Sequence, residues 1–444
     1  MKKILIANRG EIAVRIIRTA KEMGIKTVAV HSEVDAESLF VKLADESVCI
    51  GKNRAKDSYL NMMSIMSACE LTGADAVHPG YGFLSENSEF AEVVAKCGLK
   101  FIGPSAESMR VLGNKVEARA LAQKSDVPLL PGTGVITGVE EAKKFAASTD
   151  YPILIKASAG GGGRGMRVAH AAKDLEQTIV SAQSEAQTAF ACSDVFLEKF
   201  ITKPRHVEIQ IIADSHGNTY YFGERECSLQ RKHQKITEEA PASYLADKMR
   251  TKMGEVACRL AREAKYEGLG TVEFLLDEND KFYFMEMNSR IQVEHPVTEE
   301  VFGVDLVELQ LKIAAGEKLK LVQKDLKPQG HSIECRINAE DPQSFIPSPG
   351  LITAYHCPGG RGVRVDSFVY AGYKVPPFYD SMIAKLIVIG RDREHARKKM
   401  LRALGEYVVE GIKTNIPLHV KILNSADFKN SRHYTRWIEE KFLK

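Results

Sequence analysis

The segment from Glu286 to Glu294 alternates in character, and this alternation restricts it to an extended strand. Its polar members share one parity, and they are Glu286, Asn288, Arg290, Gln292 and Glu294. Met287, Ile291 and Val293 have the other parity. Because successive side chains of a strand point to opposite faces, the five polar groups are predicted to line one face. Such a row can hold metal ions, an anion and a proton acceptor in one groove. A solvated strand face is the alternative interpretation.

A second acid is predicted to lie opposite this strand. Residues 270–277 and 281–287 have the pattern of a hairpin with a two-residue loop. In that register Glu273 faces Glu286, and like charges in such positions destabilise a sheet. A divalent cation between them would remove the repulsion. Together with Asn288, the two carboxylates form an oxygen-only ligand set of the kind that suits Mg²⁺. Two solvated acids on an edge hairpin are the alternative.

The N-terminal part of the chain alternates strand and helix patterns as far as residue 103. A short apolar strand at Lys3–Asn8 precedes an amphipathic helix that ends at Gly24, and Lys26–His31 is the next strand. This repetition predicts a parallel sheet. The first turn, residues 8–11, lacks the Gly-x-Gly-x-x-Gly spacing of dinucleotide-binding proteins. The domain therefore resembles a nucleotide-binding fold without its fingerprint.

A glycine-rich segment at 160–165 lies between two strand patterns, Pro152–Ala157 and Met166–Ala169. It lacks the Gly-Lys-Ser/Thr ending and the following helix of a Walker loop. We interpret it as a mobile hairpin loop whose backbone N–H groups can close over phosphates, with Lys156 as an added cation. A flexible linker is the alternative. A basic, amide-rich run at 226–235 has the composition of an exposed loop or helix face, and its Cys227 is either a buried filler or a reactive thiol.

Composition narrows the class of protein. A chain of 444 residues predicts roughly two to four domains. A net charge of +3 gives no reason to expect nucleic acid or a membrane surface as a partner. The eight cysteines are scattered without a Cys-x-x-Cys pair, and no apolar run of about eighteen residues could span a membrane. Without a secretory signal, a reduced cytoplasmic location is expected.

Several long motifs are similar to those of biotin carboxylase, the ATP-grasp component of biotin-dependent carboxylases. They occur in the family's order along nearly the whole chain, at 7–13, 78–87, 101–104, 156–158 with the following glycines, 204–208, 286–297 and 334–342. Ala159 stands where the family often has another glycine, which would stiffen the loop slightly.

The resemblance implies a mixed α/β and α+β architecture. Its expected parts are a Rossmann-like, pre-ATP-grasp N-terminal domain at 1–113, an ATP-grasp linker and mobile lid subdomain at 114–203, a large ATP-grasp subdomain at 204–328 and a C-terminal biotin carboxylase domain at 329–444. It also implies ATP and two Mg²⁺ or Mn²⁺ ions as cofactors, and biotin as a substrate carried by another protein.

Site residues follow from the resemblance by matching position. The implied ATP contacts are Lys115, Lys156, Gly161, Gly162, Gly163, Glu198, Lys199, Ile201, His206, Gln230, His233, Glu273 and Glu286. The implied metal ligands are Glu273, Glu286 and Asn288, and the implied bicarbonate contacts are Lys235, Arg290, Gln292, Glu294 and the backbone of Val293. Tyr81 and Arg336 would meet biotin. The implied catalytic residues are Glu294 as base, Lys235, Arg290, and Arg336, which would stabilise the biotin enolate.

The implied reaction carboxylates biotin with bicarbonate and ATP through carboxyphosphate. The expected setting is acetyl-CoA carboxylase, which makes malonyl-CoA for fatty acid synthesis; pyruvate, propionyl-CoA or another acyl-CoA carboxylase remain open. Because no Ala-Met-Lys-Met biotinylation motif is present, the biotin carboxyl carrier protein and the carboxyltransferase are expected in trans. Arg15, Arg18, Glu22 and Arg364 would surround a homodimer contact. Another ATP-grasp ligase and a non-enzymatic ATP-binding subunit are the competing interpretations.

Overall fold

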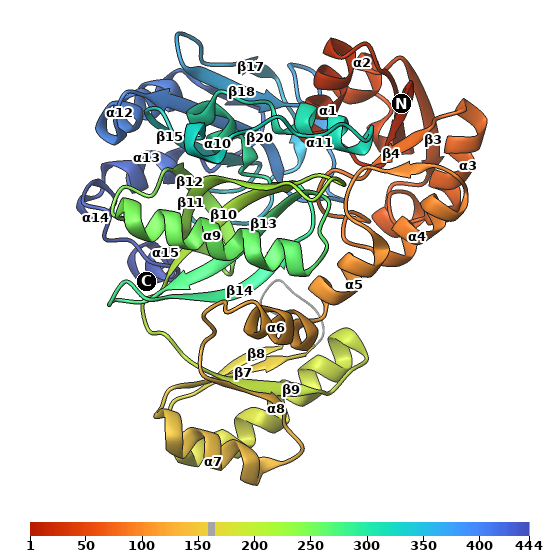
Figure 1. Ribbon diagram of the computed structural model, residues 1–444. Coiled ribbons are helices and arrows are strands. Elements are labelled where there is room, and N and C mark those ends of the chain that lie inside the picture. The colour runs from red at the N-terminus through yellow and green to blue at the C-terminus, as the bar shows by residue number, and fades with distance from the viewer. Residues whose placement is uncertain (159–164, 444) are drawn as a thin grey trace.

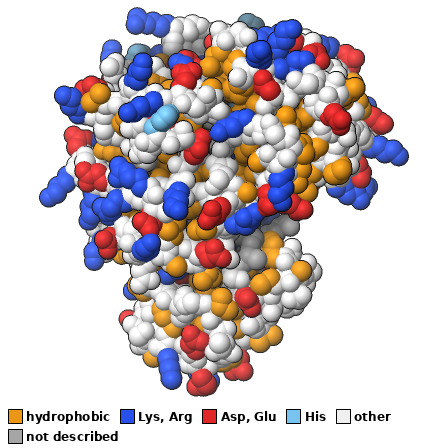
Figure 2. Space-filling model, turned by 45° about the vertical axis from the view of Figure 1, so that its right-hand side comes forward, with side chains coloured by type: hydrophobic (Ala, Val, Ile, Leu, Met, Phe, Trp, Pro, Cys, Tyr) orange, Lys and Arg blue, Asp and Glu red, His pale blue; other side chains and the backbone are white. Residues whose placement is uncertain are grey.

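The computed structural model describes residues 1–158 and 165–443. They form a broad body and a smaller lobe that projects from it (Figure 1). Lys and Arg side chains are interspersed with Asp and Glu over the face shown in Figure 2, as a net charge of +3 would suggest. None of the described helices is long and apolar enough to cross a membrane. All eight cysteines are free.

The N-terminal part contains the predicted parallel sheet, with the strand order β3-β2-β1-β4-β5. Its strands are β1 (Lys3–Ile6), β2 (Lys26–Ser32), β3 (Glu46–Gly51), β4 (Ala76–His78) and β5 (Lys100–Phe101), and the helices are α1 (Gly10–Glu22), α2 (Leu39–Leu43), α3 (Met62–Thr72), α4 (Ser88–Lys96) and α5 (Ala106–Gly113). Strand β3 was not predicted, because this edge strand is largely exposed and has only a short apolar run.

The lobe is built on a four-stranded sheet with the order β6-β9-β7-β8. Helix α6 (Lys115–Lys124) leads into it, and its elements are β6 (Gly132–Val135), α7 (Val139–Thr149), β7 (Ile153–Ala157), β8 (Met166–Ala169), α8 (Ala172–Phe190) and β9 (Val195–Lys199). Strands β7 and β8 pair antiparallel, as predicted for the arms of the glycine-rich hairpin. Residues 159–164 of that loop lie outside the described part of the chain.

A third sheet of eight strands forms the centre of the body, with the order β14-β13-β10-β11-β12-β15-β20-β18. Its strands are β10 (Arg205–Ala213), β11 (Thr219–Arg231), β12 (Gln234–Ala240), β13 (Gly268–Leu276), β14 (Phe282–Asn288), β15 (His331–Asn338), β18 (Val363–Ser367) and β20 (Met382–Gly390). Strands β12 and β15 pair antiparallel, so the sheet continues without a break across residue 328, where the family resemblance implied a domain boundary.

Helices and short strands complete the body around this sheet (Figure 1). They are α9 (Asp247–Glu263), α10 (His295–Phe302), α11 (Leu306–Ala314), β16 (Gly350–Leu351), β17 (Ala354–His356), β19 (Lys374–Val375), α12 (Arg393–Glu406), β21 (Val408–Glu410), α13 (Ile416–Asn424), α14 (Ala426–Lys429) and α15 (Trp437–Phe442). Helix α9 packs on β10 and β11 through its buried apolar stripe, which includes Met253, Val256 and Leu260.

The hairpin of β13 and β14 confirms the predicted pairing of Glu273 with Glu286. The predicted two-residue loop at 279–280 is wrong, because three residues, 278–280, separate Asp277 from Lys281 and the Asp277 N–H donates to the Lys281 carbonyl. An extra residue in β14, between the partners of Phe274 and Glu273, compensates for the longer loop.

The predicted single strand from Glu286 to Glu294 is also wrong beyond its first half. Strand β14 ends at Asn288, because the Ser289 N–H donates to the Glu86 carboxylate (3.2 Å) instead of a neighbouring strand. The chain then turns, and Glu294 becomes the N-cap residue of α10. An alternating sequence pattern cannot distinguish this turn from a continuing strand, since alternate residues can face one cavity without pairing to a neighbouring strand.

The run at 226–235 forms the end of β11 and the start of β12 rather than an exposed loop or helix face. Pairing of these strands buries Glu226, Ser228 and Gln230. Cys227 is fully buried, and burial raises the pKa of its thiol well above the ordinary value, so it is a filler of the core. Lys232 and His233 make the connecting turn with positive φ values of 47° and 65°.

Candidate active site

One cavity of about 960 Å³ lies where the lobe, the N-terminal sheet and the eight-stranded sheet meet. The predicted site residues that line it are Tyr81, Lys115, Lys156, Glu198, Lys199, Ile201, His206, Gln230, His233, Lys235, Glu273, Glu286, Asn288, Arg290, Gln292, Val293 and Arg336. Glu294 lies directly behind the lining, in contact with Lys235. Gly161, Gly162 and Gly163, predicted to contact ATP, lie outside the described residues.

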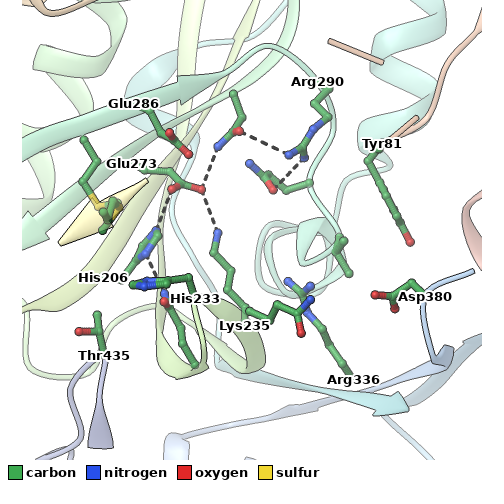
Figure 3. A pocket seen from close by; sticks show the side chains of 18 of the residues that line it. Tyr81, His206, His233, Lys235, Glu273, Glu286, Arg290, Arg336, Asp380 and Thr435 are labelled. Atoms are coloured by element: carbon green, nitrogen blue, oxygen red, sulfur yellow. Dashed lines mark hydrogen bonds and ion pairs between the residues drawn. The ribbon is translucent and has the colours of Figure 1, made fainter. Parts of the chain in front are cut away.

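Lys235 stands at the centre of the cavity (Figure 3). Its Nζ donates to Glu208 (2.5 Å), Glu273 (3.0 Å) and Glu294 (2.5 Å). Burial opposes the charged ammonium, but the three carboxylates outweigh it and raise the pKa of Lys235 well above its usual value. The side chain is therefore a fixed positive charge in the wall of the cavity.

Glu294 is fully buried and receives one cation at each oxygen. Lys235 contacts Oε1, and Arg336 Nη2 donates to Oε2 at 2.9 Å. Burial and the neighbouring Glu208 oppose ionisation, yet Lys235 and Arg336 hold the pKa of the Glu294 carboxyl below its ordinary value. Glu294 is thus an ionised carboxylate at neutral pH, in a state that can accept a proton.

Arg336 is shared between two acids. Its Nε donates to Glu238 at 2.6 Å, and its Nη2 reaches Glu294. Burial raises the pKa of Glu238 to about 7, although Arg336 acts in the opposite direction. Arg336 has Tyr81 and Asp380 as neighbours on the side of the cavity away from Glu286 (Figure 3).

The paired acids Glu273 and Glu286 line the opposite side of the cavity (Figure 3). Burial and the charge of Glu273 raise the pKa of Glu286, while Lys115 acts in the opposite direction. The Asn288 amide donates to Glu273 at 2.9 Å, which keeps the two side chains together. Two opposed carboxylates and an amide oxygen fit a hard divalent cation, because the cation would remove the repulsion that burial strengthens.

Arg290 lies along the chain between Glu286 of the acid pair and Glu294. Its Nη1 donates to Gln292 (3.0 Å), and its Nε lies 3.1 Å from a Glu86 carboxylate oxygen. The guanidinium also donates to the Ile291 carbonyl (3.3 Å) and to the Asn288 amide oxygen (3.4 Å). The guanidinium faces the cavity, where its planar donors can hold a carboxylate-like anion.

Cations surround the part of the cavity next to the lobe. Lys156 pairs with Glu198 at 2.5 Å, and Arg119 donates to the same carboxylate. His206 is 4% exposed; burial opposes its charge, but mainly Glu273 raises its pKa to about 9. Gln230 shares a 2.9 Å contact with His206. These groups could bind a polyphosphate and a nucleoside together.

Four residues that hold this site together were not found from the sequence. Glu208 binds Lys235, Glu238 binds Arg336, Glu86 binds Arg290, and the Lys385 ammonium donates to the Val293 carbonyl. Glu208 shares strand parity with His206, a signal that could have revealed it. No local pattern marks the others, because their partners come from distant parts of the chain.

A separate lobe that contributes Lys156, set against paired acids and lysines on a larger antiparallel sheet, defines an ATP-grasp enzyme. The chain matches three family models, which are described as biotin carboxylase, N-terminal domain, at residues 1–109, carbamoyl-phosphate synthase L chain, ATP binding domain, at 114–322, and biotin carboxylase C-terminal domain at 334–440. The chain belongs to the biotin carboxylase family of ATP-dependent ligases.

Individual relatives agree with this assignment. The chain is 53% identical to the biotin carboxylase of Haemophilus influenzae, with 99% of each chain covered. The structure of a Campylobacter jejuni biotin carboxylase–βγ-ATP complex has a TM-score of 0.96 and 51% identity, covering 99% of this chain and 98% of the other. The biotin carboxylase domain dimer of Hydrogenobacter thermophilus 2-oxoglutarate carboxylase, solved with MgADP, ADP and bicarbonate, has a TM-score of 0.95 and 46% identity, covering 99% and 97%.

Proposed function

We propose that this chain uses ATP, Mg²⁺ and bicarbonate to carboxylate biotin on a separate carrier protein, giving carboxybiotin, ADP and phosphate. The observation that carries the proposal is a cavity lined by two cations, Lys235 and Arg336, and by an acid pair suited to a metal, with the ionised base Glu294 directly behind the lining between the two cations. The ATP complex and the MgADP and bicarbonate complex of the relatives support it.

In the first half-reaction, Glu294 accepts the proton of bicarbonate. An oxygen of the resulting carbonate attacks the γ-phosphorus of ATP, the bond from that phosphorus to ADP breaks, and carboxyphosphate forms. Lys235 and Arg290 stabilise the anion and keep it in line with the phosphate. Glu273, Glu286 and Asn288 would hold Mg²⁺, which neutralises phosphate charge when bound.

In the second half-reaction, carboxyphosphate breaks into CO₂ and phosphate. The phosphate takes the N1′ proton of biotin, and the enolate that results attacks CO₂ through N1′. Arg336 stabilises the negative oxygen of the enolate, and Tyr81 packs beside the biotin ring. Glu294 is fully buried and the Lys235 side chain is only 11% exposed, which limits the access of water; water would otherwise hydrolyse carboxyphosphate.

We assign the chain to an acetyl-CoA carboxylase in a reduced cytoplasmic setting, with the carrier protein and the carboxyltransferase as partners in trans. A 2-oxoglutarate carboxylase domain among the relatives favours a second candidate, a carboxylase that acts on a keto acid such as pyruvate. A homodimer is also proposed. Its basis is a surface hollow lined by Arg15, Arg18, Glu22 and Arg364.

The activity can be tested with the purified protein alone. ADP release is measured with Mg-ATP, with and without bicarbonate, and then with free biotin added. ADP release that depends on bicarbonate and increases with biotin is expected; an absence of biotin stimulation would contradict the proposal. A pull-down followed by identification of the carrier and transferase would separate the acetyl-CoA setting from the keto-acid setting.

A further inference from the structure

Lys385, in strand β20, is a fully buried lysine behind the cavity. It pairs across the sheet with Arg336 of β15, so two cations occupy directly opposed positions. Like charges in such positions destabilise a sheet unless each has its own anion. Arg336 has Glu238 and Glu294, whereas the Lys385 ammonium lies 3.1 Å from Glu11 Oε1. The sheet therefore keeps a costly cation at this position.

The ammonium of Lys385 also holds the backbone beside the proposed base. It donates to the Val293 carbonyl oxygen at 2.8 Å. Val293 lies in the turn between β14 and α10, directly before the N-cap residue Glu294. Fixing this carbonyl fixes the plane of the Val293–Glu294 peptide. That plane contains the Glu294 N–H and the Cα atoms of both residues, so it anchors the point from which the Glu294 side chain leaves the turn.

Glu11 connects the same ammonium to the N-terminal sheet. It lies in the first turn of α1, is 3% exposed, and accepts a hydrogen bond from the Tyr81 hydroxyl at the oxygen that faces Lys385. Its second oxygen has no hydrogen-bond partner within the described residues. Lys385 is thus the cation in direct contact with the buried Glu11 carboxyl group. Tyr81, Glu11, Lys385 and Val293 form one continuous set of contacts.

We propose that Lys385 is a positioning residue for the reaction: it sets the turn that presents Val293 and Glu294 to bicarbonate, and it ties this turn through Glu11 to Tyr81 at the biotin position. This inference rests on the proposed function, which supplies the roles of Val293, Glu294 and Tyr81. Lys385 touches no reacting atom, and it acts through the peptide and the carboxylate that it holds.

The test uses Lys385→Met in the full-length protein, which keeps the length of the side chain and removes its charge. Because displacement of a reacting group by about 1 Å can cost roughly a hundredfold, we expect kcat of the bicarbonate-dependent ATPase to fall about 100-fold. The KM for bicarbonate is expected to rise about tenfold, while the KM for ATP stays near the wild-type value. Arg393→Met is the matched control, since Arg393 is a largely buried cation paired with Glu239 and lies outside the cavity.

A double variant, Glu11→Gln with Lys385→Met, separates positioning from folding. It removes the anion that Lys385→Met leaves unpaired, so its thermal stability should exceed that of the single variant. The Val293 carbonyl still lacks its donor, so the KM for bicarbonate should stay high. Recovery of KM together with stability would overturn the inference, as would a wild-type KM and kcat in Lys385→Met. A wild-type protein without bicarbonate-dependent, biotin-stimulated ATPase would instead contradict the proposed function.

Discussion

Replacing Arg336 with alanine should separate the two half-reactions. The guanidinium supplies one of the two cationic contacts of Glu294, at 2.9 Å, and Lys235 supplies the other at 2.5 Å. A hydrogen bond to a charged group contributes about 1.5–3 kcal/mol. Loss of one contact while the other persists should therefore reduce the bicarbonate-dependent ATPase about tenfold. The base stays in place, because Lys235 still holds it.

Biotin carboxylation should fall much further in the same variant. The enolate loses its donor, and the loss of one such donor costs about 2.7–4 kcal/mol, or roughly 10² to 10³ in rate. This loss multiplies the tenfold effect of the lost Glu294 contact, so the rate of carboxylation should fall about 10³- to 10⁴-fold. The variant should still fold, because Glu238, with a pKa of about 7 even beside Arg336, can take up a proton when its partner is removed.

The assay measures ADP release without biotin and carboxybiotin formation with biotin in the same preparations. Arg336→Lys is the matched control, since it keeps a positive charge but not the fork that spans Glu238 and Glu294. The ratio of the two activities is the informative quantity. A ratio equal to that of the wild type, with both activities lost to the same extent, would refute the assignment of Arg336 to the second half-reaction.

Three further outcomes are expected. Glu294→Gln should reduce both ADP release and carboxybiotin formation by at least about 10²-fold, since it removes the proton acceptor; retained ATPase would contradict the base assignment. Glu86→Gln should raise the KM for bicarbonate about fivefold, which is about 1 kcal/mol for a partly exposed contact with Arg290, and an unchanged KM would argue against this support. Glu238→Gln should flatten the dependence of stability on pH. The folded-state pKa of Glu238 is raised from 4.5 to about 7, so its contribution to stability is complete below pH 4.5 and is lost as the pH rises to about 7. Urea unfolding at pH 5 and 8 should show this as a difference of at most about 3 kcal/mol in the free energy of unfolding. An equal change of stability with pH in the wild type and in Glu238→Gln would contradict the shift.

The sequence contained enough information for the local elements that carry the chemistry. The alternation at 286–294 predicted that its polar side chains lie together, and they lie in or directly behind the lining of one cavity. The hairpin pattern predicted the pairing of Glu273 with Glu286, which the structure contains. Both predictions grouped the right side chains but gave the wrong backbone conformation. In the hairpin a bulge compensates for the longer loop, and after Asn288 a turn replaces the second half of the predicted strand. Different backbone conformations can place alternate residues on the same side, so alternation predicts which side chains lie together better than it predicts the secondary structure.

The supporting residues could not be predicted in the same way. Glu86 and Arg290 are joined across the boundary between two sheets, and Lys385 reaches Val293 from a strand far along the chain. A buried charge is acceptable only where its partner is present, and that partner is fixed by tertiary packing. The family resemblance implied which groups would touch substrates, whereas the ion pairs that hold those groups became visible only in the structure.

The pairing of β12 with β15 limits which segments of this protein can be exchanged with those of a relative. A chimaera joined near residue 328 would have to match two halves of one sheet, since Thr237 and Cys335 are paired across that junction. A C-terminal segment produced alone would expose the edge of β15 and leave Arg336 without Glu238 and Glu294. Carboxylases with different acceptors would therefore be expected to exchange this catalytic unit whole, and to diversify through the proteins that bind it.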